Sequence, residues 1–204
     1  HKDGWSSSTK GDSYYVNGVK AKGWQKIGGE TYYFNKKGIL QTGWLKEGDN
    51  WYYLDAKTGA MQTGWVKDGN QWYYLDKDGV MKTGWVKDGN QWYYLDKDGV
   101  MKTGWNKIGG VWYYMNGNGV MKANSWLLEN GKWYHFGRNG AMTRNHWLYE
   151  KGKWYYFGAN GVMCHDSWNY IGGKWYYFGT DGAMLSNTVT PDGYTIDSNG
   201  VWNG

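Results

Sequence analysis

The 20-residue stretch TGWVKDGNQWYYLDKDGVMK runs from Thr63 to Lys82 and is repeated unchanged from Thr83 to Lys102. Looser copies fill most of the chain, each opened by a Trp, at Trp24, Trp44, Trp65, Trp85, Trp105, Trp126, Trp147 and Trp168. A second Trp follows seven residues later in every copy except the first, which has Thr31: Trp51, Trp72, Trp92, Trp112, Trp133, Trp154 and Trp175. Repeats of this length are typical of solenoids, in which stacked units bury a core that no unit could bury alone.

The composition limits the class of protein. The chain has 17 Trp and 20 Tyr among 204 residues but one Pro and one Cys, and Leu, Ile and Phe are scarce. We therefore expect no conventional aliphatic core, and stability from aromatic faces stacked between neighbouring units of one elongated array. The net charge of +5 is spread over single Lys residues, so we predict no nucleic-acid stripe. We also predict no membrane span and no internal disulfide.

Within a unit, the spacing favours a β-hairpin. Trp72 and Tyr74 are two residues apart and would project from the same face of a strand. Asp68 and Gly69 suit a two-residue turn, which would place Trp65 directly across from Trp72. The same reasoning predicts turns at Glu47-Gly48, Asp88-Gly89, Ile108-Gly109 and Ile171-Gly172, and longer or bulged loops at residues 129–131 and 150–152. The carboxylates Asp55, Asp76 and Asp96 are expected in turns.

The repeated aromatic residues and Met suggest a ligand. Core packing alone would need only Leu or Val, whereas aromatic faces suit a sugar ring, a base or an organic cation. A quaternary ammonium needs several ring faces that converge on a charge without hydrogen-bond donors. Met adds a polarisable, adaptable wall.

The Gly-Trp pair, the Trp-Tyr-Tyr-Leu run and the Gly-x-Met ending resemble the choline-binding repeat, also called the cell-wall-binding repeat, from Gly23 to Met184. The resemblance implies an all-β solenoid of stacked hairpins in a left-handed superhelix. It implies a non-catalytic module that anchors to phosphocholine on teichoic and lipoteichoic acids at the surface of Gram-positive bacteria. It also implies choline cages made of two Trp from one hairpin, the second Tyr of the next hairpin and a Met.

Carried over to this sequence, the resemblance predicts five cages. They are Trp44, Trp51, Met61 and Tyr74; Trp65, Trp72, Met81 and Tyr94; Trp85, Trp92, Met101 and Tyr114; Trp126, Trp133, Met142 and Tyr156; and Trp147, Trp154, Met163 and Tyr177. A sixth, Trp105, Trp112 and Met121, has His135 at the Tyr position, and a protonated His would repel choline. Near the N-terminus Thr31 and Leu40 replace a Trp and a Met, so a Trp24 site is expected to be lost. The sequence leaves open whether Tyr194 closes a cage after Trp168 and Trp175.

Other chemistry has weak support in the sequence. His135, His146 and His165 lack the spacing of a zinc site, so we predict no metal. Cys164 and His165 are neighbours in sequence and would point to opposite faces of a strand, which argues against a nucleophile and base. No catalytic residues are predicted, although the segment could be the wall-binding part of a larger murein hydrolase, since it begins at His1 rather than Met.

Three domain segments and two alternative functions complete the predictions. Residues 1–22 form a divergent first unit, 23–186 the array of about eight units, and 187–204 a divergent cap. The alternatives are glucan binding, as in secreted glucosyltransferases, and a surface adhesin that also binds a host protein through the variable segment from Trp126 to Gly204.

Overall fold

The computed structural model describes residues 2–204, and every regular secondary-structure element among them is a β-strand. The strands are β1 Gly4–Ser6, β2 Ser13–Val16, β3 Val19–Lys20, β4 Gly23–Ile27, β5 Glu30–Phe34, β6 Gly43–Glu47, β7 Asn50–Leu54, β8 Gly64–Asp68, β9 Gln71–Leu75, β10 Gly84–Asp88, β11 Gln91–Leu95, β12 Gly104–Ile108, β13 Val111–Met115, β14 Ser125–Glu129, β15 Lys132–Phe136, β16 His146–Glu150, β17 Lys153–Phe157, β18 Ser167–Ile171, β19 Lys174–Phe178, β20 Thr188–Val189 and β21 Thr195–Ile196. β1 to β3 form one antiparallel sheet, and each later strand pairs with its neighbour in sequence to form a separate hairpin. None of the described residues forms a helix that could cross a membrane.

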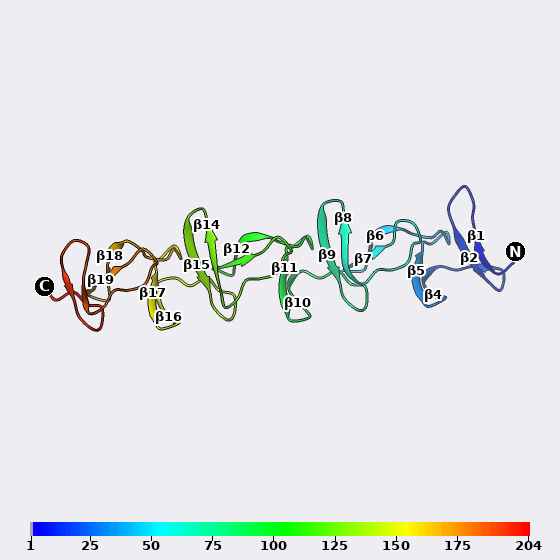
Figure 1. Ribbon diagram of the computed structural model, residues 1–204. Coiled ribbons are helices and arrows are strands. Elements are labelled where there is room, and N and C mark those ends of the chain that lie inside the picture. The colour runs from blue at the N-terminus through cyan, green and yellow to red at the C-terminus, as the bar shows by residue number, and fades with distance from the viewer. Residues whose placement is uncertain (1) are drawn as a thin grey trace. The chain divides into compact units, whose positions relative to one another are not determined.

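The chain divides into two compact units, residues 1–102 and 103–204. In the first unit the hairpins β4–β5, β6–β7, β8–β9 and β10–β11 follow one another after the N-terminal sheet (Figure 1). The hairpins β4–β5 and β10–β11 project to one side of that unit and β8–β9 to the opposite side. The second unit contains the hairpins from β12–β13 to β20–β21. Each unit is therefore a repeat-hairpin solenoid, which confirms the predicted all-β fold class.

The hairpin turns lie one residue later than predicted. Asp68 pairs with Gln71, so the two central residues are Gly69 and Asn70. Gly69 has a φ of 60°, as the first position of a type II′ turn requires. The predicted register is therefore wrong, because Trp65 pairs with Tyr74 and not with Trp72. The displacement is two residues along the partner strand, so both Trp side chains still project from the same face.

The same correction applies to the other turns. Their central residues are Gly48-Asp49, Gly89-Asn90, Gly109-Gly110 and Gly172-Gly173. At residues 129–131 and 150–152 the loops are two-residue turns and not the longer or bulged loops predicted, with Asn130-Gly131 and Lys151-Gly152 at their centres. All four of those central residues have positive φ, which satisfies a type I′ turn without extra residues.

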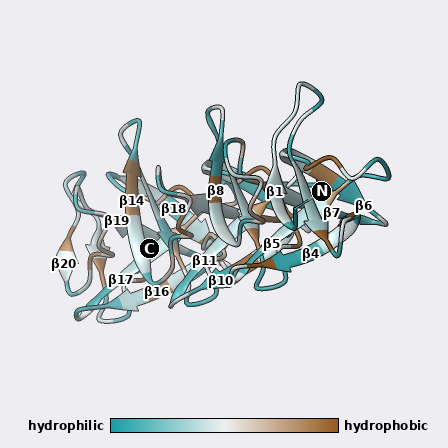
Figure 2. Cartoon of the chain, turned by 90° about the vertical axis from the view of Figure 1, so that its right-hand side faces the viewer, coloured by the Kyte–Doolittle hydropathy of each residue, from teal (hydrophilic) through white to brown (hydrophobic). Residues whose placement is uncertain are grey.

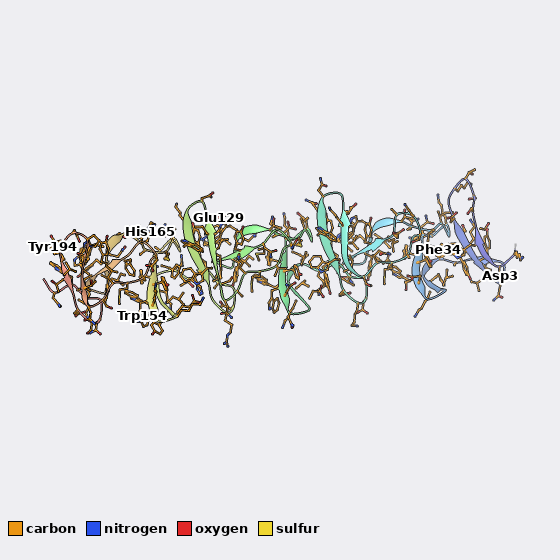
Figure 3. The ribbon with its side chains drawn as sticks, viewed as in Figure 1. Asp3, Phe34, Glu129, Trp154, His165 and Tyr194 are labelled. Carbon is orange, nitrogen blue, oxygen red and sulfur yellow. The ribbon has the colours of Figure 1, made fainter. Side chains whose placement is uncertain are left out.

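Within each compact unit, every hairpin contributes one fully buried side chain from the end of its second strand. These side chains are Phe34, Leu54, Leu75, Leu95, Met115, Phe136, Phe157, Phe178 and Ile196, and Phe34 is labelled in Figure 3. Each forms an isolated bridge with a residue of its own connector, as Leu75 does with Met81. Composition alone led us to expect no aliphatic core, but one buried residue per unit suffices because each unit covers its neighbour.

The connectors after the hairpins are ordered by polar turns, as predicted. Asp76 Oδ1 accepts hydrogen bonds from the backbone N–H groups of Asp78 and Val80, at 2.9 and 3.0 Å. Asp96 repeats this pattern, which confirms a turn role for these carboxylates. The hairpin ends and connectors are mainly hydrophilic, and hydrophobic residues lie along strands such as β8 and β14 (Figure 2).

Candidate functional site

Each hairpin from β6–β7 to β18–β19 presents two Trp side chains on one face. In β12–β13, Trp105 and Trp112 lie on diagonal positions of one face, with ring centroids 6.3 Å apart and planes at 85°. The second Trp is strongly exposed for so large a ring, 40% at Trp72, Trp92 and Trp133 alike. Aromatic surface left in water at most repeats suggests a binding surface rather than core packing.

The first Tyr of the next hairpin closes the group of rings. Tyr134 of β15 lies with its ring centroid 4.9 Å from that of Trp105, in edge-to-face geometry. The arrangement recurs as the pairs Trp24–Tyr52, Trp44–Tyr73, Trp65–Tyr93, Trp126–Tyr155 and Trp147–Tyr176. Three rings from two consecutive hairpins therefore converge at each of these junctions except that of Trp24, where Thr31 stands in place of the second Trp.

A Met from the connector after the second hairpin forms the remaining wall. The backbone N–H of Met142 donates to the carbonyl of Trp112, 2.9 Å away, which fixes the Met beside the Trp pair. Its thioether lies against Gly161 of the following connector, where a Cβ would come within 2.4 Å of Met142 Sδ. The resulting pockets are lined by Trp105, Trp112, Tyr134 and Met142; by Trp126, Trp133, Tyr155 and Met163; and by Trp147, Trp154, Tyr176 and Met184.

The predicted Trp pairs come together, but the predicted Tyr residues lie elsewhere. The second Tyr of each hairpin faces the opening Trp of its own hairpin, because the two residues are directly paired across the strands. Ring centroids are 5.0 to 5.3 Å apart for Tyr74, Tyr94, Tyr114, Tyr156 and Tyr177. Those five residues therefore support the pocket wall from within a hairpin. Before Tyr74, Tyr94, Tyr156 and Tyr177, the Tyr one position earlier closes the pocket.

The predicted Met residues belong to the pockets one repeat earlier than the prediction placed them. The N–H of Met81 bonds to the carbonyl of Trp51, and that of Met101 to Trp72, so each Met serves the Trp pair of the preceding hairpin. The Met61 N–H bonds in the same way to Thr31, where the second ring is missing. The Met121 side chain packs against Gly140. The predicted cage of Trp85, Trp92, Met101 and Tyr114 draws on both compact units and stays a prediction, as does ligand binding at every pocket.

His135 lies outside the pocket that it was predicted to close. Its side chain is buried, 7% exposed, and its Nδ1 lies 2.9 Å from the hydroxyl of Thr143. The ring packs on Trp126 of its own hairpin, at 5.3 Å. Burial lowers the pKa of His135, and the charge of Glu150 opposes this in part. The pocket at Trp105 and Trp112 is closed by Tyr134 instead, so repulsion by a protonated His does not disable it.

A carboxylate that sequence analysis missed binds the opening Trp of several pockets. The indole Nε1 of Trp126 donates to Glu150, the last residue of β16 in the next hairpin, at 2.7 Å. Equivalent bonds join Trp44 to Asp68, Trp65 to Asp88, Trp105 to Glu129 and Trp168 to Asp192. The sequence signal, which Asp192 lacks, is an acidic residue three positions after the opening Trp of the next hairpin. Such a carboxylate orients the indole and adds negative potential at a site for a cation.

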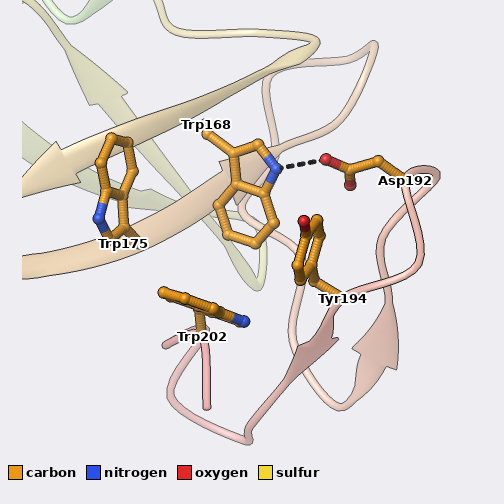
Figure 4. Close-up of a pocket in the computed structure, with 5 residues that line it drawn as sticks. All are labelled: Trp168, Trp175, Asp192, Tyr194 and Trp202. Carbon is orange, nitrogen blue, oxygen red and sulfur yellow. Dashed lines mark hydrogen bonds between the residues drawn. The ribbon is translucent and has the colours of Figure 1, made fainter. Parts of the chain in front are cut away.

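The last pocket has a fourth ring in place of the Met (Figure 4). Trp202 donates its backbone N–H to the carbonyl of Trp175 at 3.1 Å and bridges to Ile196, as each Met does in its repeat. Tyr194 lies 5.9 Å from Trp168 and 5.8 Å from Trp202, both edge-to-face. Tyr194, which the sequence left undecided, therefore does close a pocket, with a volume of about 320 Å³.

Asp192 adds a negative charge to that terminal pocket. The Thr190 hydroxyl, and after it the Trp168 indole, donate hydrogen bonds that hold the pKa of Asp192 below its ordinary value. The carboxyl is therefore ionised near neutral pH.

The His, Cys and acidic side chains within residues 2–204 show no arrangement typical of metal binding or nucleophilic chemistry. The described residues contain no group of three or more His, Cys, Asp or Glu that could hold a metal ion. Cys164 Sγ lies 3.4 Å from Asn169 Oδ1 and His165 pairs with Asp166 at 3.0 Å, so the thiol and the imidazole have separate partners. Burial raises the pKa of Cys164, which disfavours the reactive thiolate.

Comparison with known families gives matches over nearly the whole chain. A family profile described as a choline-binding repeat matches residues 21–63, 62–103, 82–126, 102–147 and 123–168. A second profile, also described as a choline-binding repeat, matches residues 162–202. No curated protein matches the chain.

Several solved structures from Streptococcus pneumoniae are similar to this one. CbpJ is 28% identical, with a TM-score of 0.74 over 98% of this chain and all of its own. The choline-binding domain of CbpL is 31% identical, with a TM-score of 0.70, covering 90% of this chain and 98% of its own. The modular autolysin LytC is 29% identical, with a TM-score of 0.71 over 89% of this chain but only 42% of its own length.

Proposed function

Because this chain belongs to the choline-binding repeat family, we propose that it anchors to phosphocholine on teichoic and lipoteichoic acids of a bacterial cell wall. The observation that supports this proposal most directly is the repeated pocket of two Trp, one Tyr and one Met, as at Trp147, Trp154, Tyr176 and Met184. Its walls offer ring faces and a thioether to the ligand, which suits a trimethylammonium group that has no hydrogen-bond donors.

The module acts by binding alone, and its location is the cell surface. The similar protein LytC is named a modular autolysin, and this chain spans less than half of it, consistent with a wall-binding part beside a separate catalytic part. CbpF, 28% identical over 98% of this chain with a TM-score of 0.72, is described in the presence of a peptidoglycan analogue. Both descriptions support a wall ligand.

Repetition supplies the affinity that one pocket lacks. Each cation–π contact contributes about 0.5 to 2 kcal/mol, so three rings less the cost of ordering give on the order of 4 kcal/mol. That corresponds to a dissociation constant near roughly 1 mM for one pocket. A polymer with many phosphocholines engages several pockets at once and gains about 10² to 10⁴ in avidity.

Glucan binding fits these pockets less well. A sugar platform needs polar side chains beside the rings at every site to bond the hydroxyls. The walls that these pockets share are Trp, Tyr and Met, and the polar residues at their rims differ from one pocket to the next. The carboxylates near the opening Trp are already engaged by indole N–H groups, as Glu150 is by Trp126.

Calorimetry with free choline and with an isomaltose oligomer separates the two functions. We expect saturable heat with choline only, and release of the protein from choline-bearing walls by excess choline. Absence of heat with choline, together with wall attachment that excess choline does not reverse, would contradict the proposed function.

A further inference from the structure

The pockets of the second unit differ at their rims more than in their aromatic walls. Arg144 and Asn160 border the pocket of Trp105 and Trp112. Ser186, Ser198 and Asn199 border that of Trp147 and Trp154. Glu150, Lys151 and Asp181 border that of Trp126 and Trp133. The rim is therefore positive at the first pocket, neutral at the second and mixed at the third.

Arg144 is available to a ligand. It is exposed, and no carboxylate among residues 2–204 forms an ion pair with it. Glu129 accepts the hydrogen bond of the Trp105 indole, so its charge is held at the Trp wall. By contrast, at the pocket of mixed charge Asp181 is paired with Lys153 at 2.8 Å.

Asn160 offers a second donor at the same rim. Its Oδ1 accepts the backbone N–H of Val162 at 3.1 Å, which orients the side-chain amide and leaves the NH₂ group as a donor. The aromatic cage suits the cationic group of a ligand, and the guanidinium and amide NH₂ beside it suit an anionic group on the same ligand. Arginine binds phosphate oxygens with two parallel hydrogen bonds.

We propose that Arg144 makes the pocket of Trp105 and Trp112 selective for phosphocholine over choline. This inference rests on the proposed function. The rings hold the trimethylammonium group, and the guanidinium, with the Asn160 amide, pairs with the phosphate that follows it. The neutral rim at Ser186 gives no such preference, and the ionised Asp192 of the terminal pocket opposes an anionic ligand.

Methionine methyl resonances provide a separate readout for each pocket. With ¹³C-methyl methionine in the full chain, Met142 reports the pocket bordered by Arg144, and Met184 reports the matched pocket bordered by Ser186. Titrations would use choline, phosphocholine and glycerophosphocholine as probes. We expect Met142 to respond to both phosphate-bearing probes at concentrations roughly fivefold lower than to choline, as an exposed ion pair allows, and Met184 to show no preference.

Substitutions at the exposed rim test the assignment without disturbing the core. Arg144→Ser should abolish the preference at Met142 without weakening choline binding there, because it removes a positive charge beside a site for a cation. Arg144→Lys should retain only part of the preference. Ser186→Arg should create the preference at Met184. Equal affinities for choline and phosphocholine at Met142 in the native chain, or a preference that survives Arg144→Ser, would overturn the inference.

The proposed function fails by a different result, namely no methyl response to choline at any pocket. Phosphocholine esters occur on wall polymers and on lipid headgroups, and glycerophosphocholine represents both. Cosedimentation with choline-bearing walls and with phosphatidylcholine vesicles identifies the source. In either case Arg144→Ser must weaken the binding for the inference to hold.

Discussion

The indole Nε1 of Trp65 donates a hydrogen bond to the carboxylate of Asp88 in the next hairpin, 3.0 Å away. The bond joins two consecutive repeats at the edge of the Trp65, Trp72 and Tyr93 group. Because the acceptor is charged, it orients the ring and also brings a negative charge to the place where a cation would bind.

Asp88→Asn should weaken choline binding at this group without unfolding the hairpin. Asn keeps an oxygen that accepts the indole N–H but removes the charge, so we expect roughly two- to fivefold weaker binding. Calorimetry at low and high salt would measure it, because screening should reduce the difference. Asp78→Asn is the matched control, since Asp78 is exposed in a connector and pairs with Lys77. Equal effects of the two substitutions would mean that net charge alone matters.

Tyr93→Ala and Tyr94→Ala should have different consequences although the residues are adjacent. Tyr93 lies 4.7 Å from Trp65 of the preceding hairpin, whereas Tyr94 lies 5.1 Å from Trp85 of its own. Tyr93→Ala should remove one ring from a pocket and cost about 0.5 to 2 kcal/mol of choline binding there. Tyr94→Ala should mainly lower the thermal stability. Calorimetry and thermal denaturation on both variants would reveal the reverse pattern if the second Tyr were the ligand-binding one.

The sequence predicted the fold class well because the period and the alternation within each unit report directly on hairpins. It placed the turns one residue early because Asp68-Gly69 and Gly69-Asn70 are both acceptable turn pairs. Only the choice between type I′ and type II′ separates them, and the φ of 60° at Gly69 with a negative φ at Asn70 decides for type II′. The side of the strand on which each Trp lies was nevertheless predicted correctly. A shift of the turn by one residue changes the pairing along the partner strand by two residues, which keeps each side chain on the same face.

The composition of the pockets was harder to predict because it depends on how hairpins stack. Trp-Tyr-Tyr offers two Tyr residues on opposite faces, and sequence alone does not say which face meets the previous repeat. Met142 belongs to the pocket of Trp112, which lies 30 residues earlier, and only the backbone hydrogen bond between them reveals this. The spacing of residues within one repeat does not indicate which residues of different repeats are in contact.

The free energy of unfolding of the second unit should decrease as the pH is lowered, because of His135. Burial lowers the pKa of His135 in the folded protein, so the unfolded chain binds the proton more readily. The stabilisation is complete above the unfolded value of about 6.5 and is lost as the pH falls through it. The groups that face this imidazole are Thr143, Trp126, Phe157 and the more distant Glu150.

Urea unfolding of the native chain and of His135→Tyr at pH 7.5 and pH 5 would measure this contribution. Tyr occupies the equivalent position in most other hairpins, so the variant should fold and lose less stability on acidification. An identical loss in both proteins would assign the pH dependence to other groups.

Gly99→Ala should destabilise the first unit more than Gly89→Ala. Both glycines have positive φ, 81° and 61°, so both substitutions incur a backbone cost of roughly 1 to 2 kcal/mol. Only at Gly99 would the new Cβ also come within 2.5 Å of a neighbouring atom, Met81 Sδ, whereas at Gly89 it meets nothing within 4 Å. Thermal denaturation of Gly99→Ala with and without Met81→Ala would test the contact. Met81→Ala should remove the additional destabilisation caused by Gly99→Ala. If the two substitutions instead lower the stability additively, the contact with Met81 is not its cause.

Trp202 should make the terminal pocket the tightest choline site of the second unit. It supplies a fourth ring where other pockets have a thioether, and Asp192 adds a charge beside Trp168. Trp202→Met should reduce affinity to that of the Met-lined pockets, by about 0.5 to 2 kcal/mol for one cation–π contact, and Trp202→Ala should reduce it further. Choline titrations followed by calorimetry would show the highest-affinity phase weakening in that order. If Trp202→Ala left this phase unchanged, the tightest site would lie elsewhere, and the Met-lined pockets with a carboxylate at Glu129 or Glu150 would be the next to test.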